Sequence, residues 1–500
     1  MRRRFRRNAS YFPCKIDQLE TDLKDGFFNS LPNFVAKKFK QDSQKYIVMY
    51  ISYMVEEEQI YKYVIDNIQR SQKKWDTNTL INEISLKDGE KRTNIKDIGN
   101  DILQGSVAIY IDGEDSCVTY PVPKLIKRPP EKAETESLIF GPKIAFSESL
   151  TTNLNIVHWR MDNSNLKSEK FIIGNELPSE IRLIYLSDIA EPDIVKEMRR
   201  RLNKLETDDV LESSVLTQYI EDNSYSLFPQ LHVTELPDRF CYELKEGKVG
   251  LLIDKSPSGV IAPTTFLSFF ESTEDLYTRW NMGTFIRLMR LIGMFLSITL
   301  TPFYVAALTF HYEIIPTALL VSLGHSRSRV PFPPVLEALI LEFFLELIRE
   351  AGARLPTKVG QTMGIVGGIV VGQAIVQAGF TSNILIIIAA LSALASFTIP
   401  SYLMSSAVRI LRFPLIIMSG LWGFMGLFFC YAFLLIHLLK QQSMKRPYLT
   451  PIFPFRPRDL DNSIIRLPFL QSNFRAYSNS PKDTKRFKEP PKTNKTDIEE

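Results

Sequence analysis

Residues 359–408 read VGQTMGIVGGIVVGQAIVQAGFTSNILIIIAALSALASFTIPSYLMSSAV, a run without Asp, Glu, Lys, Arg or His. A membrane-spanning helix needs ~20 consecutive apolar residues. The run therefore has room for two spans, at 360–379 and 384–404. Uncharged segments at 291–310 and 413–436 are also long enough to cross. Four such segments predict an α-helical polytopic membrane domain over 286–440.

A fifth segment, residues 335–350, has a mixed character. Glu342, Glu346 and Glu350 follow one another at four-residue spacing, so on a helix they share one stripe, and Leu and Phe side chains cover most of the rest. Acids at this spacing repel one another and favour water, a cation or basic partners such as Arg349 and Arg354. Two interpretations follow: an amphipathic helix on the membrane surface, or a fifth span that lines a pore or polar cavity.

Glycines recur every four residues in the first span of the long run. Glycine weakens a helix unless its missing side chain is used, and in a membrane its use is close approach between helices. The pattern predicts a packing face, either within one subunit or between copies of a homo-oligomer. The candidate helix-packing and oligomerisation residues are Gly360, Gly364, Gly368 and Gly372.

The charged region before the spans contains two stretches that resemble each other. In each, a β-rich segment leads into a helical pattern, and a glycine later precedes a second β-rich segment that ends in Asp. This predicts an α/β soluble region of two related subdomains, at 40–125 and 175–285, joined by a linker at 126–174. The matching segments are Tyr46–Ser52 with 56–70, Ile181–Ser187 with 191–205, and Leu103–Asp112 with Leu244–Asp254.

The two ends of the chain are polar. Residues 1–39 begin with an arginine-rich stretch that no apolar signal segment follows, and we expect a flexible N-terminus that could contact anionic lipid. Residues 441–500 contain several prolines and end in a Lys-rich stretch, which predicts an extended, partly disordered tail. We expect the soluble region to be cytoplasmic. The charge rule leaves the side of the tail open, because that side depends on whether 335–350 crosses.

No motif of a catalytic or cofactor site is present. The sequence lacks a Walker A loop, a dinucleotide fingerprint and a GxSxG elbow, and its five histidines show no metal-ligand spacing. The four cysteines show no CxxC spacing, which favours free thiols in a reducing compartment. A net charge of +4 is too small to indicate nucleic-acid binding. We expect no enzyme activity, no cofactor and no metal.

Several stretches together resemble the A subunit of GerA-type spore nutrient-germinant receptors over about residues 40–475. The soluble region contributes Phe140–Leu150, Ser226–Gln230, Thr234–Asp238, Glu246–Val249 and Ser272–Asp275. The membrane half contributes Val330–Pro333, Glu346–Ala351, Arg354–Pro356 and Gly364–Gly368. Leu236 and Leu276 depart from the family, which usually has arginine and tyrosine there, so the resemblance suggests a divergent member.

The resemblance implies a multi-pass subunit in the inner membrane of a spore. Its expected partners are a transporter-like B subunit and a C-subunit lipoprotein. Its expected role is to couple nutrient sensing to ion release, and an oligomeric ion channel is one form of that role. Two alternatives remain. One is a scaffold without its own pore, and the other is a secondary transporter, which an inverted repeat across the spans would indicate.

Overall fold

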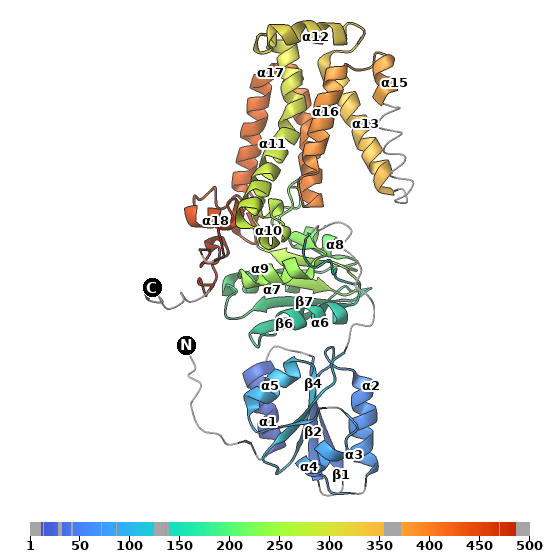
Figure 1. The fold of residues 1–500 in the computed structure, drawn as a ribbon, viewed down its shortest axis with the longest axis vertical. Helices are drawn as coiled ribbons and strands as arrows, with labels where there is room; N and C mark the ends of the chain where they lie inside the picture. Colours follow the sequence, from blue (N-terminus) through green and yellow to red (C-terminus); the bar gives the residue numbers. More distant parts are fainter. Residues whose placement is uncertain are drawn as a thin grey trace, which may run out of the picture.

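The computed structural model of the protein describes residues 12–13, 15–28, 33–41, 44–71, 73–86, 88–124, 136, 140–354, 372–469 and 471–486. Figure 1 shows three parts stacked along the long axis of the molecule. A first α/β subdomain lies at one end, a second lies in the middle, and a bundle of helices forms the other end. The predicted fold class, an α/β region followed by a helical region, is confirmed.

The first subdomain contains one antiparallel sheet with the strand order β1-β2-β4-β5-β3. Its strands are β1 (Phe34–Gln41), β2 (Gln44–Ile51), β3 (Glu90–Arg92), β4 (Ser106–Ile111) and β5 (Cys117–Pro121). Its helical elements are α1 (Ile16–Leu23), η1 (Lys24–Phe28), α2 (Glu57–Gln59), η2 (Ile60–Ile65), α3 (Asp66–Arg70), α4 (Thr77–Glu83) and α5 (Ile95–Leu103). Because side chains alternate along a strand, β2 feeds two cores. Ile47 and Met49 face α1 and α5, while Val48 and Tyr50 face η2 and α4.

The second subdomain repeats this arrangement, with the strand order β6-β7-β9-β10-β8. Its strands are β6 (Leu166–Ile173), β7 (Ser179–Leu186), β8 (His232–Thr234), β9 (Val249–Ile253) and β10 (Gly259–Ala262). Its helices are α6 (Leu150–Arg160), α7 (Pro192–Lys204), α8 (Ser213–Ile220) and α9 (Pro237–Lys245). In both subdomains the first two strands form a hairpin, and the fourth strand pairs with the second. The two segments that the sequence matched therefore fold alike.

Equivalent glycines connect a helix to the central strand of each sheet. Gly105 follows α5 with φ +85°, and Gly247 follows α9 with φ +92°. Only glycine adopts this left-handed conformation without steric cost, so it suits the residue just after a helix. The predicted turn before each strand lies at the same place in both folds.

The structure corrects two predicted boundaries. The second half of the predicted linker 126–174 contains α6 and β6, which belong to the second subdomain. The predicted flexible segment 1–39 contains α1, whose Leu19 and Leu23 are buried against the first sheet. Both helices are short, and short helices become stable only by packing, here on a sheet.

The helical part begins with η3 (Phe266–Phe270) and α10 (Glu274–Tyr277) beneath the bundle. The bundle contains α11 (Trp280–Phe310), α12 (Thr317–Arg327), α13 (Pro334–Arg354), α15 (Gly372–Gln377), α16 (Asn383–Ser396) and α17 (Tyr402–Lys440), with η4 (Tyr312–Ile314) between α11 and α12. Among the described residues, α11 and α17 are long and apolar enough to cross a membrane, and α16 is a shorter apolar helix. The predicted spans 291–310 and 413–436 lie within α11 and α17. Most of the predicted span 360–379 lies outside the described residues.

Helix α17 reverses direction at Gly423, which has non-helical dihedral angles. A Cβ atom added to Gly426 would lie 2.1 Å from the carbonyl oxygen of Met418, so the two sides of Gly423 lie against each other. The predicted single span 413–436 is therefore wrong. It contains the tip of a hairpin of two helices. The sequence did not predict this turn, because the turn lies at a glycine inside an apolar run that is long enough for one span.

This reversal brings the chain back to the α/β region. The segment after Lys440 forms β11 (Gln442–Ser443) and β12 (Arg446–Pro447), followed by η6 (Pro457–Asp459), α18 (Leu460–Ser463) and η7 (Tyr477–Asn479). Ser443 contacts Gln230 of the second subdomain, so this segment and the α/β region lie at the same end of the bundle. The prediction of an extended tail from residue 441 is wrong up to residue 486. Residues 487–500 lie outside the described part.

Candidate functional site: charged groups inside and beneath the helical bundle

Glu342 of α13 is buried in the bundle and is paired with Arg412 of α17. Arg412 Nη1 lies 2.5 Å from Glu342 Oε2, and the Thr301 hydroxyl of α11 donates to Oε1 at 2.8 Å. The side chains of the pair are each 2% exposed. The Glu342–Arg412 pair thus joins three helices in the buried interior of the bundle, where an unpaired charge is costly.

Arg412 has further acceptors, which satisfy the rest of its guanidinium. It donates from Nε to the carbonyl oxygen of Ser297 at 2.9 Å and from Nη2 to the Ser297 hydroxyl at 2.8 Å. Ser392 of α16 donates to the same carbonyl at 2.8 Å. In the sequence, Arg412 lies between the predicted spans 384–404 and 413–436. Its burial could not be seen, because the partner acid lies 70 positions earlier.

A second buried acid of α13 is Glu337, which lies outside the four-residue spacing of Glu342, Glu346 and Glu350. Its carboxylate accepts a hydrogen bond from the backbone N–H of Ser382 at 2.6 Å and one from the Thr381 hydroxyl at 3.1 Å. Arg327 Nε lies 3.5 Å from Glu337 Oε2. This acid therefore fixes the start of α16 to α13 near the far end of the bundle (Figure 1).

The other two acids of the predicted stripe lie nearer the α/β region. Glu346 Oε1 lies 2.9 Å from Arg349 Nη1 and 3.4 Å from Arg409 Nε. Glu350 is exposed and pairs with Arg354 at 2.5 Å. The structure thus places the three acids along one helix in different surroundings, since Glu342 is enclosed and Glu350 faces outward.

Of the candidate glycines, Gly360, Gly364 and Gly368 lie outside the described residues. Gly372 begins α15, and a Cβ atom added there meets nothing within 4 Å in the part of the chain that the structure describes. The space beside Gly372 is therefore open within the described part of one subunit.

A buried ion pair connects the bundle to the α/β region. Asp275 of α10 is fully enclosed, and its carboxylate lies 3.0 Å from Arg287 Nε and 2.8 Å from Arg290 Nη1, both on α11. Arg290 also donates to the carbonyl oxygen of Phe270 at 3.2 Å. These contacts hold the first turns of α11 to the end of the second subdomain.

A cavity of about 10 Å³ lies beside this ion pair, lined by Arg239, Glu271 and Arg287 among others. Burial raises the pKa of Glu271 to about 7, against the opposing effect of the Arg287 charge. The cavity has room for about one water molecule. It is far smaller than the ~300 Å³ or more of a typical small-molecule site.

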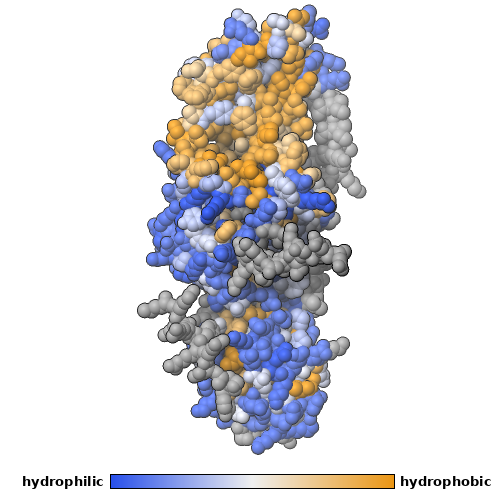
Figure 2. Space-filling view, turned by 60° about the vertical axis from the view of Figure 1, so that its left-hand side comes forward, coloured by the Kyte–Doolittle hydropathy of each residue, from blue (hydrophilic) through white to orange (hydrophobic). Residues whose placement is uncertain are grey.

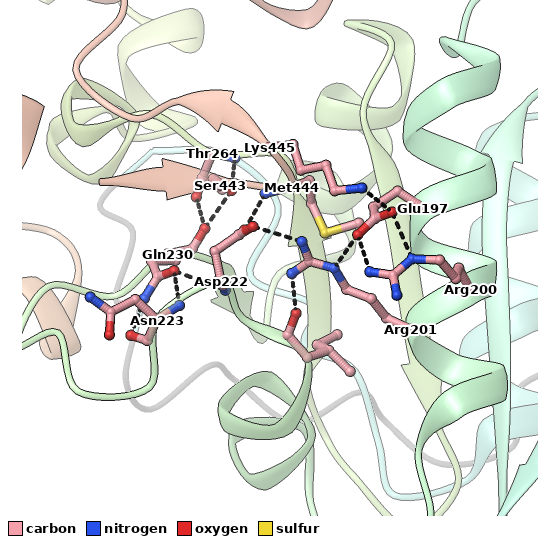
Figure 3. Close-up of polar contacts among 11 residues, drawn as sticks. Glu197, Arg200, Arg201, Asp222, Asn223, Gln230, Thr264, Ser443, Met444 and Lys445 are labelled. Atoms are coloured by element: carbon pink, nitrogen blue, oxygen red, sulfur yellow. Dashed lines mark hydrogen bonds and ion pairs between the residues drawn. The ribbon is translucent and has the colours of Figure 1, made fainter. Parts of the chain in front are cut away.

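A second connection is the short β-hairpin that follows α17, shown in Figure 3. Met444 and Lys445 form its tip with φ of 50° and 62°. The Met444 side chain is 2% exposed and packs in the core between the second sheet, α7 and α8. Its backbone N–H donates to Asp222 at 2.6 Å, and Lys445 lies 2.8 Å from Glu197. The hairpin therefore fixes the end of α17 to the second subdomain.

Ion pairs within the second subdomain orient the acids that contact the hairpin. Arg201 of α7 lies 2.9 Å from Glu197 and 2.7 Å from Asp222, so both acids are held in place before the hairpin adds its own donors. Glu197 also contacts Arg200 at 2.7 Å. These cations and hydrogen bonds, led by Arg200, hold the pKa of Glu197 well below its usual value. The carboxylate is thus charged at neutral pH and available to Lys445.

Met444→Ala is expected to loosen this connection. Truncating a buried methionine costs about 2–5 kcal/mol through lost contacts and the cavity left behind. Residues 441–448 should then become more accessible, which hydrogen exchange of the full chain in detergent measures. Lys445→Gln is the matched control, because its side chain is 62% exposed and its ion pair contributes little. Unchanged exchange in Met444→Ala would show that the hairpin is not held by its core contact.

Comparisons with known proteins support one family. The model of the Bacillus/Clostridium GerA spore germination protein family matches residues 21–477. The chain is 42% identical to spore germination protein GerQA of Bacillus cereus, over 87% of each chain. It is 36% identical to spore germination protein KA of Bacillus subtilis (strain 168), over 89% of this chain and 82% of that one. The crystal structure of the N-terminal domain of the A subunit of the Bacillus megaterium spore germinant receptor GerK3 matches at 26% identity with a TM-score of 0.42, over 52% of this chain and 99% of that one.

Proposed function

Because this chain belongs to the Bacillus/Clostridium GerA family of spore germination proteins, we propose that it is the receptor subunit that couples nutrient sensing to ion release at the start of germination. In this proposal several copies form an ion channel in the inner membrane of the spore, together with a transporter-like B subunit and a lipoprotein C subunit. The chain contributes no catalytic chemistry.

The charged groups of the bundle carry this proposal. Apolar residues would fill the site of the Glu342–Arg412 pair at lower cost, so a buried ion pair inside a membrane region indicates a functional role. Glu346 and Glu350 continue from the pair toward the end of α13 that lies nearest the α/β region (Figure 1). We propose that these two acids line the mouth of the ion path and concentrate cations there.

The two connections beneath the bundle supply the coupling. The Asp275 ion pair holds the start of α11, and the Met444 hairpin holds the end of α17. A displacement of the second subdomain therefore acts on both helices, and the buried partners of Arg412 lie on α11 and α13. The α/β region and the segment after α17 lie on one side, which we propose is the cytoplasmic side.

Replacing Glu346 and Glu350 together with Gln is expected to slow cation release from germinating spores or to change its selectivity. Glutamine keeps the size and hydrogen bonding of the side chain but removes the charge. Glu342 is left intact, because Gln there would leave Arg412 without its carboxylate. The measurement is cation release after nutrient addition, with the protein level checked by immunoblot. Glu313→Gln in η4 is the matched control, since that acid is exposed and lies at the far end of the bundle.

Normal release at a normal protein level in the double variant would exclude these acids from the ion path. It would favour the surface-helix interpretation of α13, or a scaffold without its own pore, because solvated acids outside the path do not affect release.

Gly372→Leu is expected to reduce the oligomer and leave the single subunit intact. The reason is the space beside Gly372, which is open as far as the described residues extend and which a second copy can approach closely. We propose the same role for Gly360, Gly364 and Gly368. Crosslinking of the full chain in membranes measures the oligomer. Gly324→Leu on α12 is the control: a Cβ atom there also meets nothing within 4 Å among the described residues, but Gly324 lies outside the run of glycines at four-residue spacing. An unchanged crosslinking pattern would mean that the glycines do not form the contact between subunits.

A further inference from the structure

The segment that follows the hairpin exposes a group of large apolar side chains. Tyr448 and Leu449 are buried beneath the bundle, and the Tyr448 hydroxyl donates to the carbonyl oxygen of Pro229 at 2.6 Å. Directly after them, Ile452, Phe453 and Phe455 are 48%, 56% and 70% exposed. Single exposed apolar residues are common, but adjacent ones of this size indicate an interaction surface.

This segment is fastened beside the first turns of α11. Arg466 donates to the carbonyl oxygen of Leu276 at 2.9 Å, and its backbone N–H donates to the Thr284 hydroxyl at 3.1 Å. The Arg466 guanidinium lies 4.7 Å from the ring centre of Phe469, which is 56% exposed. Phe469 and the part of the segment around Arg466 thus lie at the base of the bundle.

The outward face of α11 is apolar down to its first turns, at the base of the bundle. Trp280, Met282 and Phe285 are all about half exposed, although Arg287 and Arg290 point inward to Asp275. Tryptophan at the end of an apolar helix is typical of the boundary between membrane and water. In Figure 2 the apolar surface of the bundle meets the hydrophilic surface of the α/β region at this base.

Two arginines accompany the exposed rings. Arg458 is exposed, and the Arg456 guanidinium lies 4.9 Å from the ring centre of Tyr477. Aromatic side chains interleaved with arginines suit the headgroup layer of a bilayer, where rings enter the acyl boundary and cations contact phosphates.

We propose that residues 452–469 form an interfacial anchor that inserts Ile452, Phe453 and Phe455 into the membrane boundary and binds anionic phospholipid headgroups through Arg458. The occupant of this surface is the bilayer around the bundle, because Arg466 fastens the segment to the first turns of α11, whose outward face is apolar. The inference rests on the proposed membrane placement of the bundle. The anchor adds a contact that holds the hairpin and the second subdomain at a fixed distance from the membrane surface.

The test uses nitroxide labels on the full chain in nanodiscs made of equal parts phosphatidylcholine and phosphatidylglycerol. The native cysteines are replaced by alanine, and Phe455→Cys is labelled. Collision with oxygen, which dissolves in lipid, is compared with collision with a water-soluble nickel chelate. Phe295→Cys on the exposed face of α11 is the lipid reference, and Trp159→Cys on α6 is the water reference.

Phe455→Cys is expected to shift toward the oxygen-accessible signature of Phe295→Cys. A water signature at 455 with a lipid signature at 295 would overturn the anchor but leave the membrane bundle intact. A water signature at both would overturn the membrane placement itself. Low access to both reagents at 455 would mean that protein covers the surface, which also overturns the anchor.

Arg458→Gln tests the headgroup contact on the same labelled protein. The shift of the label at position 455 toward the oxygen-accessible signature should become smaller in the anionic nanodiscs and stay unchanged in pure phosphatidylcholine. An equal effect in both lipids would overturn the anionic contact. A photocrosslinking amino acid at position 455, with all native cysteines kept, provides a second readout if the cysteine-free chain does not fold. Adducts with phospholipid support the anchor, and adducts with protein contradict it.

Discussion

Arg412→Met is expected to destabilise the helical bundle by about 3–5 kcal/mol, because Glu342 then stays buried without its cation. Thermal unfolding of the purified full chain in detergent measures the loss, and the protein level in spore membranes should fall with it. Arg412→Lys should recover only part of the stability, because lysine keeps the charge but cannot reach Ser297 and Glu342 together as the guanidinium does.

The double variant Arg412→Met with Glu342→Leu is the control for this prediction. Replacing both charges by apolar side chains of similar size is often neutral, so most of the stability should return. If the double variant is as unstable as Arg412→Met alone, then the loss comes from packing around position 412 and not from the unpaired acid. Slow ion release in a stable double variant would show that the pair contributes to function.

Asp275→Asn should have a loss of similar size, also about 3–5 kcal/mol, because Arg287 and Arg290 would then lack their shared carboxylate in a buried site. Asparagine keeps the shape of the side chain, so cavity formation does not contribute. Hydrogen exchange of the full chain in detergent should rise at α10 and the first turns of α11. Thermal unfolding of the same sample gives the overall loss.

The neighbouring acid on α10 provides the control. Glu274 is only half-buried, and Glu274→Gln should leave exchange at α11 unchanged. Equal effects of the two substitutions would mean that helix α10 responds to the loss of either carboxylate. The Asp275 ion pair would then not be what holds α11 to the second subdomain.

The α/β region was largely predictable because its signals are local. The β-rich runs at 46–52 and 181–187 alternate between two cores, and each precedes an amphipathic helix. The glycines at 105 and 247 mark the same turn in both copies. The short edge strands β3 and β8 carry no such pattern, because their place depends on pairing with β5 and β10.

The functional site could be predicted only in part. The spacing of the glutamates indicated a polar face on α13, but which acid is enclosed depends on contacts with α11 and α17. The reversal at Gly423 lies inside an uninterrupted apolar run. The docking of Met444 follows from that reversal, because it brings the end of α17 back to the second subdomain. Long-range contacts of this kind leave no local pattern.

The measurement that tests the central claim most directly is the conductance of the purified chain in a planar lipid bilayer. If copies of this chain form the ion path, the reconstituted oligomer should give cation-selective current, and Glu346→Gln with Glu350→Gln should lower the current or its selectivity. Oligomers that insert into the bilayer but carry no current, alone or with both partner subunits and nutrient present, would contradict the claim and identify the chain as a scaffold.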